Sequence, residues 1–201
     1  MKKITSILIF VLTLSLTAQE DYIITIGDQV KSISLDTNYD ILVNGKKTKV
    51  SVTKKDTLNY GENFYNFKYI KKHKISKAQV DEDIDQIMMM TAGGSGVLVQ
   101  NYGSFNPTML QEMMLNEITK ESVSYGYKLD RQDYDRKLAS GESLRVLKAV
   151  LEYRGEIETY EVSAYGRKDE GILIMTMDMD IDTDTDGKNM IDLFWKSLNI
   201  N

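Results

Sequence analysis

The run GILIMTMDMDI, from Gly171 to Ile181, is the stretch of sequence that decides the fold. Its residues alternate in character, with apolar side chains at every second position: Met175, Met177, Met179 and Ile181 against Thr176, Asp178, Asp180 and Asp182. Successive side chains of a β-strand point to opposite faces. The run is therefore predicted to be a strand with one face against a core.

Three earlier runs are also candidate strands, Tyr127–Leu138, Leu144–Arg154 and Ile157–Tyr165, although the last two of them could also be interpreted as helix. Turn residues separate the four runs at Ser140-Gly141, at Gly155 and at Asp169-Glu170-Gly171. Strands joined by such short turns pair antiparallel. A mainly antiparallel sheet is expected over this part of the chain.

Antiparallel strands are also expected further upstream. Asn44-Gly45 suits the positive-φ pair of a type I′ turn, so Tyr39–Val43 and Lys47–Thr53 are predicted to form a hairpin. Alternation over Phe64–Ile70 predicts another strand.

The segment after residue 80 has two interpretations. Val80, Ile84, Ile87 and Met88 have helical spacing, whereas Ile87–Met90, the flexible Ala92–Gly96 and Val97–Val99 fit a hairpin. We favour the hairpin.

Two helices complete the prediction. The first begins at Asn106 and Pro107, closes at Gly126, and has an apolar stripe of Leu110, Met113, Met114 and Ile118. The second, Lys188–Leu198, has a stripe of Ile191, Phe194, Trp195 and Leu198. The predicted fold class is α+β, a mainly antiparallel sheet with helices packed on it.

The first 18 residues have the three parts of a secretory signal peptide: the basic start Met1-Lys2-Lys3, the apolar Ile4–Leu16, and the small Ala18 at the cleavage point. The apolar stretch is roughly a dozen residues, short of the ~20 that a membrane-spanning helix needs. The mature chain is predicted to begin at Gln19, to be periplasmic or secreted, and not to be embedded in a membrane. The absence of cysteine excludes disulfides and a lipoprotein anchor.

The mature chain suits one domain. We expect a β-hairpin extension over residues 19–63 and an α+β domain over residues 64–201. Residues 19–79 hold 11 Lys and Arg against 7 Asp and Glu, whereas residues 80–201 hold 12 against 23. This acidic balance argues against nucleic acid as a partner. The local basic cluster is interpreted as a solvated loop or edge strand, with an anion contact as the alternative; it comprises Lys68, Lys71, Lys72, His73, Lys74 and Lys77.

In the order of their elements, residues 64–201 resemble the PsbP/DcrB-type α/β/α sandwich. The resemblance lies in a strand ending near Tyr69, a hairpin into Val97–Tyr102, a helix from Pro107, a run of antiparallel strands, and a closing helix over Met190–Leu198. It implies an interaction module that acts through its surface, often outside the bacterial cytoplasm. It brings no shared catalytic residues, and we expect no cofactor.

One acidic string has the character of a metal site, Asp182-Thr183-Asp184-Thr185-Asp186-Gly187. Alternate carboxylates before a glycine match the first half of an EF-hand loop, so Asp182, Asp184 and Asp186 are candidate calcium ligands. The second half departs from that pattern, because Asn189 and Leu193 replace the aliphatic residue and the bidentate glutamate. We favour an acidic turn in which Asp184 or Asp186 caps the last helix.

No catalytic set is evident. Gly93-Gly94-Ser95-Gly96 lacks the features of a nucleophile elbow or a phosphate loop, and His73, the single histidine, lies in a basic run. The clustered methionines are interpreted as core, with a soft binding groove as the alternative. We therefore expect a non-catalytic binding or accessory domain of the bacterial cell envelope, whose partner is another envelope or extracellular protein. The alternatives are a carboxylate-based hydrolase and a weak calcium-binding secreted protein.

Overall fold

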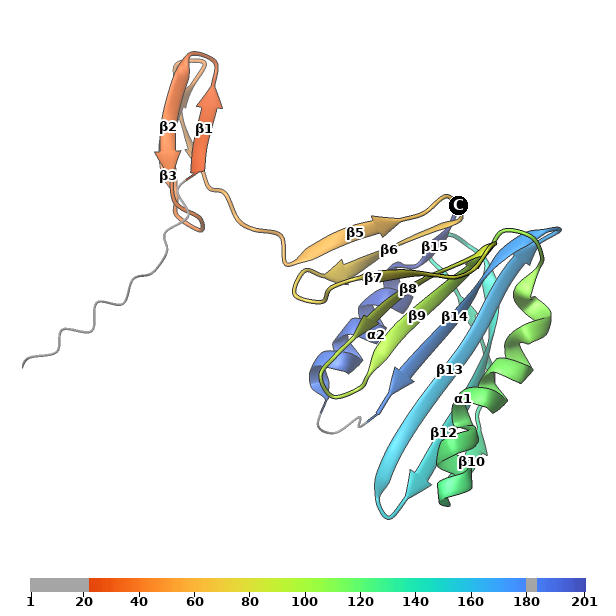
Figure 1. The fold of residues 1–201 in the computed structure, drawn as a ribbon. Helices are drawn as coiled ribbons and strands as arrows, with labels where there is room; N and C mark the ends of the chain where they lie inside the picture. Colours follow the sequence, from red (N-terminus) through yellow and green to blue (C-terminus); the bar gives the residue numbers. More distant parts are fainter. Residues whose placement is uncertain (1–21, 180–183) are drawn as a thin grey trace, which may run out of the picture. The chain divides into compact units, whose positions relative to one another are not determined.

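The structure is a computed structural model that describes residues 22–179 and 184–201 (Figure 1). It contains two compact units, Met1–Lys54 and Lys55–Asn201, here the first and second unit. The sequence-based boundary lay between residues 63 and 64. The segment Thr57–Gly61, assigned there to the extension, is a strand of the second unit.

Two antiparallel hairpins make up the described part of the first unit. They are β1 (Tyr22–Ile26) with β2 (Gln29–Ile33), and β3 (Tyr39–Val43) with β4 (Lys46–Val50). Asn44 and Gly45 have φ of 50° and 76°. These values suit a type I′ turn and confirm the predicted hairpin.

Eight antiparallel strands form the main sheet of the second unit. In spatial order they are β10 (Lys128–Arg131), β12 (Ser143–Tyr153), β13 (Glu156–Arg167), β14 (Glu170–Asp178), β9 (Gly96–Tyr102), β8 (Ile84–Met90) and β7 (Ser76–Asp81), and β11 (Tyr134–Lys137) also pairs with β12. The hairpin of β8 and β9 confirms the favoured interpretation. The mainly antiparallel α+β fold is therefore as predicted.

The run predicted as one strand over Tyr127–Leu138 is two strands, β10 and β11. The chain breaks between them because Asp133 leaves the ladder, and its carboxylate accepts a hydrogen bond from the backbone N–H of Lys148 at 3.1 Å. The strand predicted to reach Ile181 ends at Asp178, and residues 180–183 lie outside the described residues. β7 was not predicted, because all six of its residues are exposed and it lacks an apolar face.

One face of the main sheet is partly covered by η1 (Pro107–Leu110) and α1 (Gln111–Tyr125). The helix α1 packs on β12 and β13, and η1 packs on β13 and β14. Gly126 closes α1 with a φ of 115°, as predicted. The predicted stripe is partly wrong: Met113 is 58% exposed, while Leu115 and Thr119 are buried. Because the 3₁₀ helix η1 has fewer residues per turn than an α-helix, the helical spacing predicted from Leu110 does not continue unchanged into α1.

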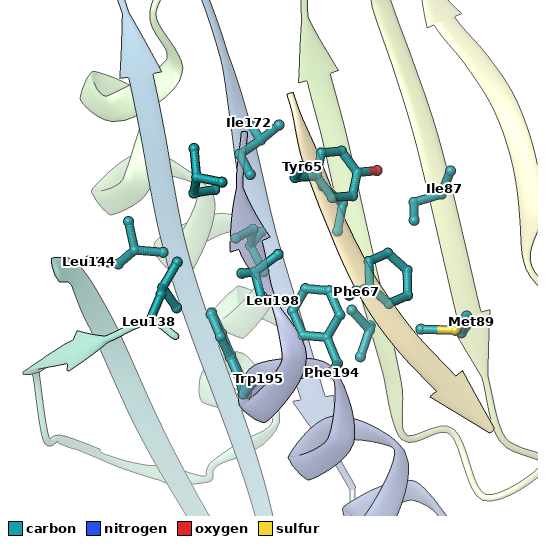
Figure 2. Packing of buried hydrophobic residues seen from close by; sticks show 14 of the residues in the cluster. Tyr65, Phe67, Ile87, Met89, Leu138, Leu144, Ile172, Phe194, Trp195 and Leu198 are labelled. Atoms are coloured by element: carbon teal, nitrogen blue, oxygen red, sulfur yellow. The ribbon is translucent and has the colours of Figure 1, made fainter. Parts of the chain in front are cut away.

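A second layer covers part of the other face. It consists of α2 (Thr185–Ser197) and a small sheet of β5 (Thr57–Gly61), β6 (Tyr65–Ile70) and β15 (Asn199–Ile200). Figure 2 shows Phe67 of β6 beside Phe194 of α2, and their rings meet edge-on at 5.0 Å. The last helix and its buried Phe194, Trp195 and Leu198 are as predicted.

Candidate functional site

The two faces of β8 and β9 have different surroundings. Ile87, Met89, Val97 and Val99 point toward the second layer and are buried. The side chains of the opposite parity are mostly partly buried or exposed, although Tyr102 is buried, because among residues 55–179 and 184–201 the main contacts of η1 and α1 are with β12, β13 and β14. We call this side the open face. Its side chains are Ala78, Ile84, Gln86, Met88, Met90, Leu98, Gln100 and Met177.

On the open face, the side chains of β8 and β9 carry no charge, and apolar residues predominate toward the hairpin turn that joins the two strands. Met88 lies opposite Leu98 in the register, and Met90 lies opposite Gly96. A Cβ at Gly96 would lie 2.0 Å from Met90 Sδ, so the Met90 thioether lies over the glycine backbone. Met90 nevertheless remains 37% exposed. Gly96 thus provides space for a flexible apolar side chain that stays accessible to solvent.

A polar pair divides the open face. Gln100 Nε2 donates to Gln86 Oε1 at 3.0 Å, and Tyr102 OH donates to Gln100 Oε1 at 2.7 Å. Because these amides satisfy each other, this part of the face gains polar character without a charged group. The apolar area around Met88, Met90 and Leu98 lies on one side of the pair.

One side of α1 borders the open face. Glu112 pairs with Arg131 of β10 at 3.1 Å, which turns that side of α1 toward the β10 edge. Met114 is two residues, or about 200°, further around the helix. Met114 and Ile118 therefore face away from β10 and pack against the same core as Leu98 and Met177. On the outer surface of η1 and α1, Met109 is 80% and Met113 is 58% exposed.

The methionines therefore divide between core and surface. Met89, Met175 and Met190 are buried, as the core interpretation expected. Met109 and Met113 are not core residues, and Met88 and Met90 lie on the open face. Both parities of Ile84–Met90 are rich in apolar residues, although the second layer covers only one side of β8 and β9. That pattern was the signal for an open apolar face.

Carboxylates lie next to the open face on the α1 side. Tyr160 OH contacts Met179 Sδ at 3.7 Å and donates to Glu158 Oε2 at 3.0 Å. Burial first of all, and then the nearby charges of Glu158 and Glu121, raise the pKa of Tyr160 to about 12. Glu82 and Asp83 form the turn between β7 and β8, at the opposite end of β8 from Met90.

Two of the three candidate calcium ligands lie among the described residues, and each makes different contacts. Asp182 lies outside the described residues. Asp184 caps α2, where it accepts hydrogen bonds from Gly187 N at 2.8 Å and from Thr91 Oγ1 at 2.6 Å. These two hydrogen bonds, that from Thr91 first, lower the pKa of Asp184. Asp186 pairs with Lys72 at 2.6 Å and lies 3.5 Å from His73 Nε2.

The residues considered for catalysis have structural contacts. His73 is buried beside Asp186, and Ser95 is buried with its Oγ accepting a hydrogen bond from Met179 N at 3.2 Å. In the described ranges, four carboxyl groups have displaced pKa values, those of Glu62, Asp133, Glu142 and Asp184. All four are lowered by hydrogen bonds, whereas a general acid needs a raised pKa.

A separate pocket lies on the opposite side of the main sheet, beside α2. It has a volume of about 260 Å³ and is lined by charged residues of β11, β12, β13, β14 and α2 together with Trp195. Arg136 lines it, with its guanidinium 4.4 Å from the centre of the Trp195 ring. The sequence does not predict this pocket, because its residues come from five separate elements.

No protein family matches the sequence, and no curated protein matches it. Among solved structures, the solution structure of cyanobacterial PsbP (CyanoP) from Synechocystis sp. PCC 6803 is similar, with 11% identity and a TM-score of 0.47. The match covers 73% of this chain and 93% of that chain. A crystal structure from Bacteroides thetaiotaomicron matches with 8% identity and a TM-score of 0.32, over 68% of this chain and 45% of that one. PsbP is the family that the sequence itself resembles. In the part of the chain that the structure describes, no helix is both long and apolar enough to cross a bilayer.

Proposed function

We propose that this chain is an exported, non-catalytic binding protein, and that its partner, another envelope or extracellular protein, docks on the open face. The observation that carries the proposal is the sheet face of β8 and β9, which displays methionine and leucine without a charged side chain. Exposed apolar surface of this kind is typical of a binding site. Methionine side chains suit it, because they are flexible and adapt to different apolar shapes.

The charge around this surface indicates the chemistry of the partner. Glu121 and Glu158 lie at the Tyr160 end, and Glu82 and Asp83 lie at the β7 turn. An apolar centre bordered by carboxylates is complementary to an amphipathic segment with Lys or Arg along its edges. The partner is therefore proposed to present a basic amphipathic helix.

A synthetic helical peptide of leucine and lysine tests this proposal. Its binding to the mature protein is measured by fluorescence anisotropy, beside a scrambled peptide of the same composition and a leucine and glutamate counterpart. We expect saturable binding of the amphipathic basic peptide only. Equal binding of the scrambled or the acidic peptide would contradict the proposed chemistry.

Two variants place the peptide on the open face. Replacing Met88 and Met90 together by glutamine removes apolar contact on the open face without adding charge, and burying one such side chain is worth about 1.5–3 kcal/mol. We expect at least a tenfold loss of affinity. The control is Leu129→Gln, another exposed apolar residue, on β10 beyond α1. An unchanged affinity in the double variant, or an equal loss in the control, would show that the peptide binds elsewhere.

A further inference from the structure

The pocket beside α2 differs from the open face in its chemistry. We call it the α2 pocket; its lining includes Arg136, Lys148, Thr159, Asp178, Lys188 and Trp195. Its volume of about 260 Å³ is below the roughly 300–1,000 Å³ of pockets for drug-sized ligands. The pocket is thus suited to a small polar group.

Several hydrogen-bond donors around the pocket have no acceptor. Trp195 is 4% exposed, and its indole Nε1 is buried without a partner, as are Arg136 Nε and Thr159 Oγ1. A buried donor that has lost water and gained no acceptor costs free energy. Three such atoms around one small pocket indicate that an acceptor belongs there.

Arg136 is held in a fixed orientation by its neighbours. Its Nη2 contacts the hydroxyl of Tyr134 and lies 3.4 Å from Glu161 Oε2, and its guanidinium stacks on Trp195. Glu161 also accepts a hydrogen bond from Tyr134 OH at 2.7 Å. These contacts use one edge of the guanidinium and leave Nε without an acceptor.

The positive charges of the two pocket lysines are not neutralised by an ion pair within the described residues. Within residues 22–179 and 184–201, neither Lys148 nor Lys188 has a carboxylate within ion-pair distance. By contrast, Glu161 is engaged by Arg136, and Asp192 pairs with Lys196 at 3.6 Å. Asp178 also lines the pocket, opposite Thr159 in the register. Because its carboxylate repels other anions, a ligand of low negative charge is favoured over a highly charged one.

We propose that the α2 pocket binds a small oxyanion, the carboxylate or phosphate group of a ligand. Lys148 and Lys188 neutralise its charge, and Trp195, Arg136 and Thr159 donate hydrogen bonds to its oxygens. Charge-assisted hydrogen bonds of this kind are the strong ones in proteins. The proposal is independent of the open face, because the two surfaces lie on opposite sides of the main sheet.

Trp195 is the single tryptophan of the chain, so its fluorescence reports on the pocket directly. The full mature protein is titrated with inorganic phosphate and with acetate, and sodium chloride at equal ionic strength serves as the reference. We expect a saturable change in fluorescence with at least one oxyanion. Saturation by phosphate alone identifies a phosphate group, and saturation by acetate alone identifies a carboxylate. A change that is linear, or is equal in chloride, would overturn the proposal.

Charge-neutral variants locate the binding. Lys148→Gln and Lys188→Gln are each expected to weaken binding at least tenfold. Lys120→Gln makes the same change of charge on α1, on the other side of the sheet, and is expected to change affinity less than twofold. Equal losses in all three variants would attribute binding to net charge and would refute the site.

Discussion

Replacing Asp184 by alanine should destabilise the second unit, because this side chain joins the start of α2 to the turn between β8 and β9. It accepts hydrogen bonds from Gly187 N and Thr91 Oγ1. An alanine at a helix N-cap costs about 0.5–2 kcal/mol, and a hydrogen bond to a charged group is worth about 1.5–3 kcal/mol. Asp184 is partly exposed, so we expect the lower end of the sum, about 2 kcal/mol.

The assay is urea denaturation followed by the fluorescence of Trp195, which reports on the second unit alone. A loss of about 2 kcal/mol corresponds to a fall in Tm of roughly 4–8 °C. Asp184→Asn keeps a capping oxygen and should lose less than alanine. The matched control is Asp186→Ala, which removes an exposed ion pair with Lys72 and should cost less than about 1 kcal/mol.

The pH dependence gives an independent check. The folded state lowers the pKa of Asp184, so its charged form stabilises the protein above the pKa of the unfolded chain, and this contribution is lost as the pH falls through the lower, folded pKa. The difference between wild type and Asp184→Asn should be full at pH 6 and should shrink below about pH 4. If Asp184→Ala unfolds at the wild-type urea concentration, or Asp186→Ala costs more, the capping role is wrong.

Four further predictions concern other parts of the chain. Gly171→Ala places a Cβ 2.5 Å from both Pro107 Cδ and the carbonyl oxygen of Tyr165, so we expect a loss of about 1–3 kcal/mol in urea denaturation. Gly103→Ala, with its nearest neighbour at 3.7 Å, is the control and should be close to neutral. Deleting residues 188–201 removes Phe194 and Trp195, each worth about 1.5–3 kcal/mol, and circular dichroism should show an unfolded second unit; an unchanged Tm would refute this. Intact-mass analysis of exported protein should find Gln19 at the N-terminus, and a product that retains residues 1–16 would contradict the signal peptide. Calcium at about 10 µM should leave Tm unchanged, since we expect a Kd weaker than about 10⁻⁴ M, and micromolar binding by calorimetry that Asp184→Asn abolishes would overturn this.

Much of the fold was predictable because it is encoded locally. Asn44-Gly45 defines its own turn, and the turn signals at Ser140-Gly141 and Gly155 separate strands that the structure also contains, with positive φ at both glycines. The stripe of Phe194, Trp195 and Leu198 likewise defines the buried side of α2. In each of these cases the pattern and the packing agree within a single element.

The remainder depends on contacts between distant residues. β7 has no apolar face, and its strand conformation comes from pairing with β8. The break before Tyr134 depends on Asp133 reaching the backbone of Lys148. For the candidate sites, composition identified the methionines, but only the limited reach of α1 shows which of them remain accessible. The α2 pocket has no local signal, since Arg136, Lys148 and Trp195 meet only after folding.

The pairing of β15 with β6 has a consequence for the order of events during synthesis. Asn66 Nδ2 donates to Asn201 Oδ1 at 2.6 Å, across a sequence separation of 135 residues. At about 5–20 residues per second, a ribosome needs on the order of ten seconds to travel from one partner to the other. During that time Tyr65 and Phe67 lack α2, so half of the core is exposed on the growing chain. The second layer can therefore close only after α2 and β15, which are more than 100 residues further along the chain, have been synthesised.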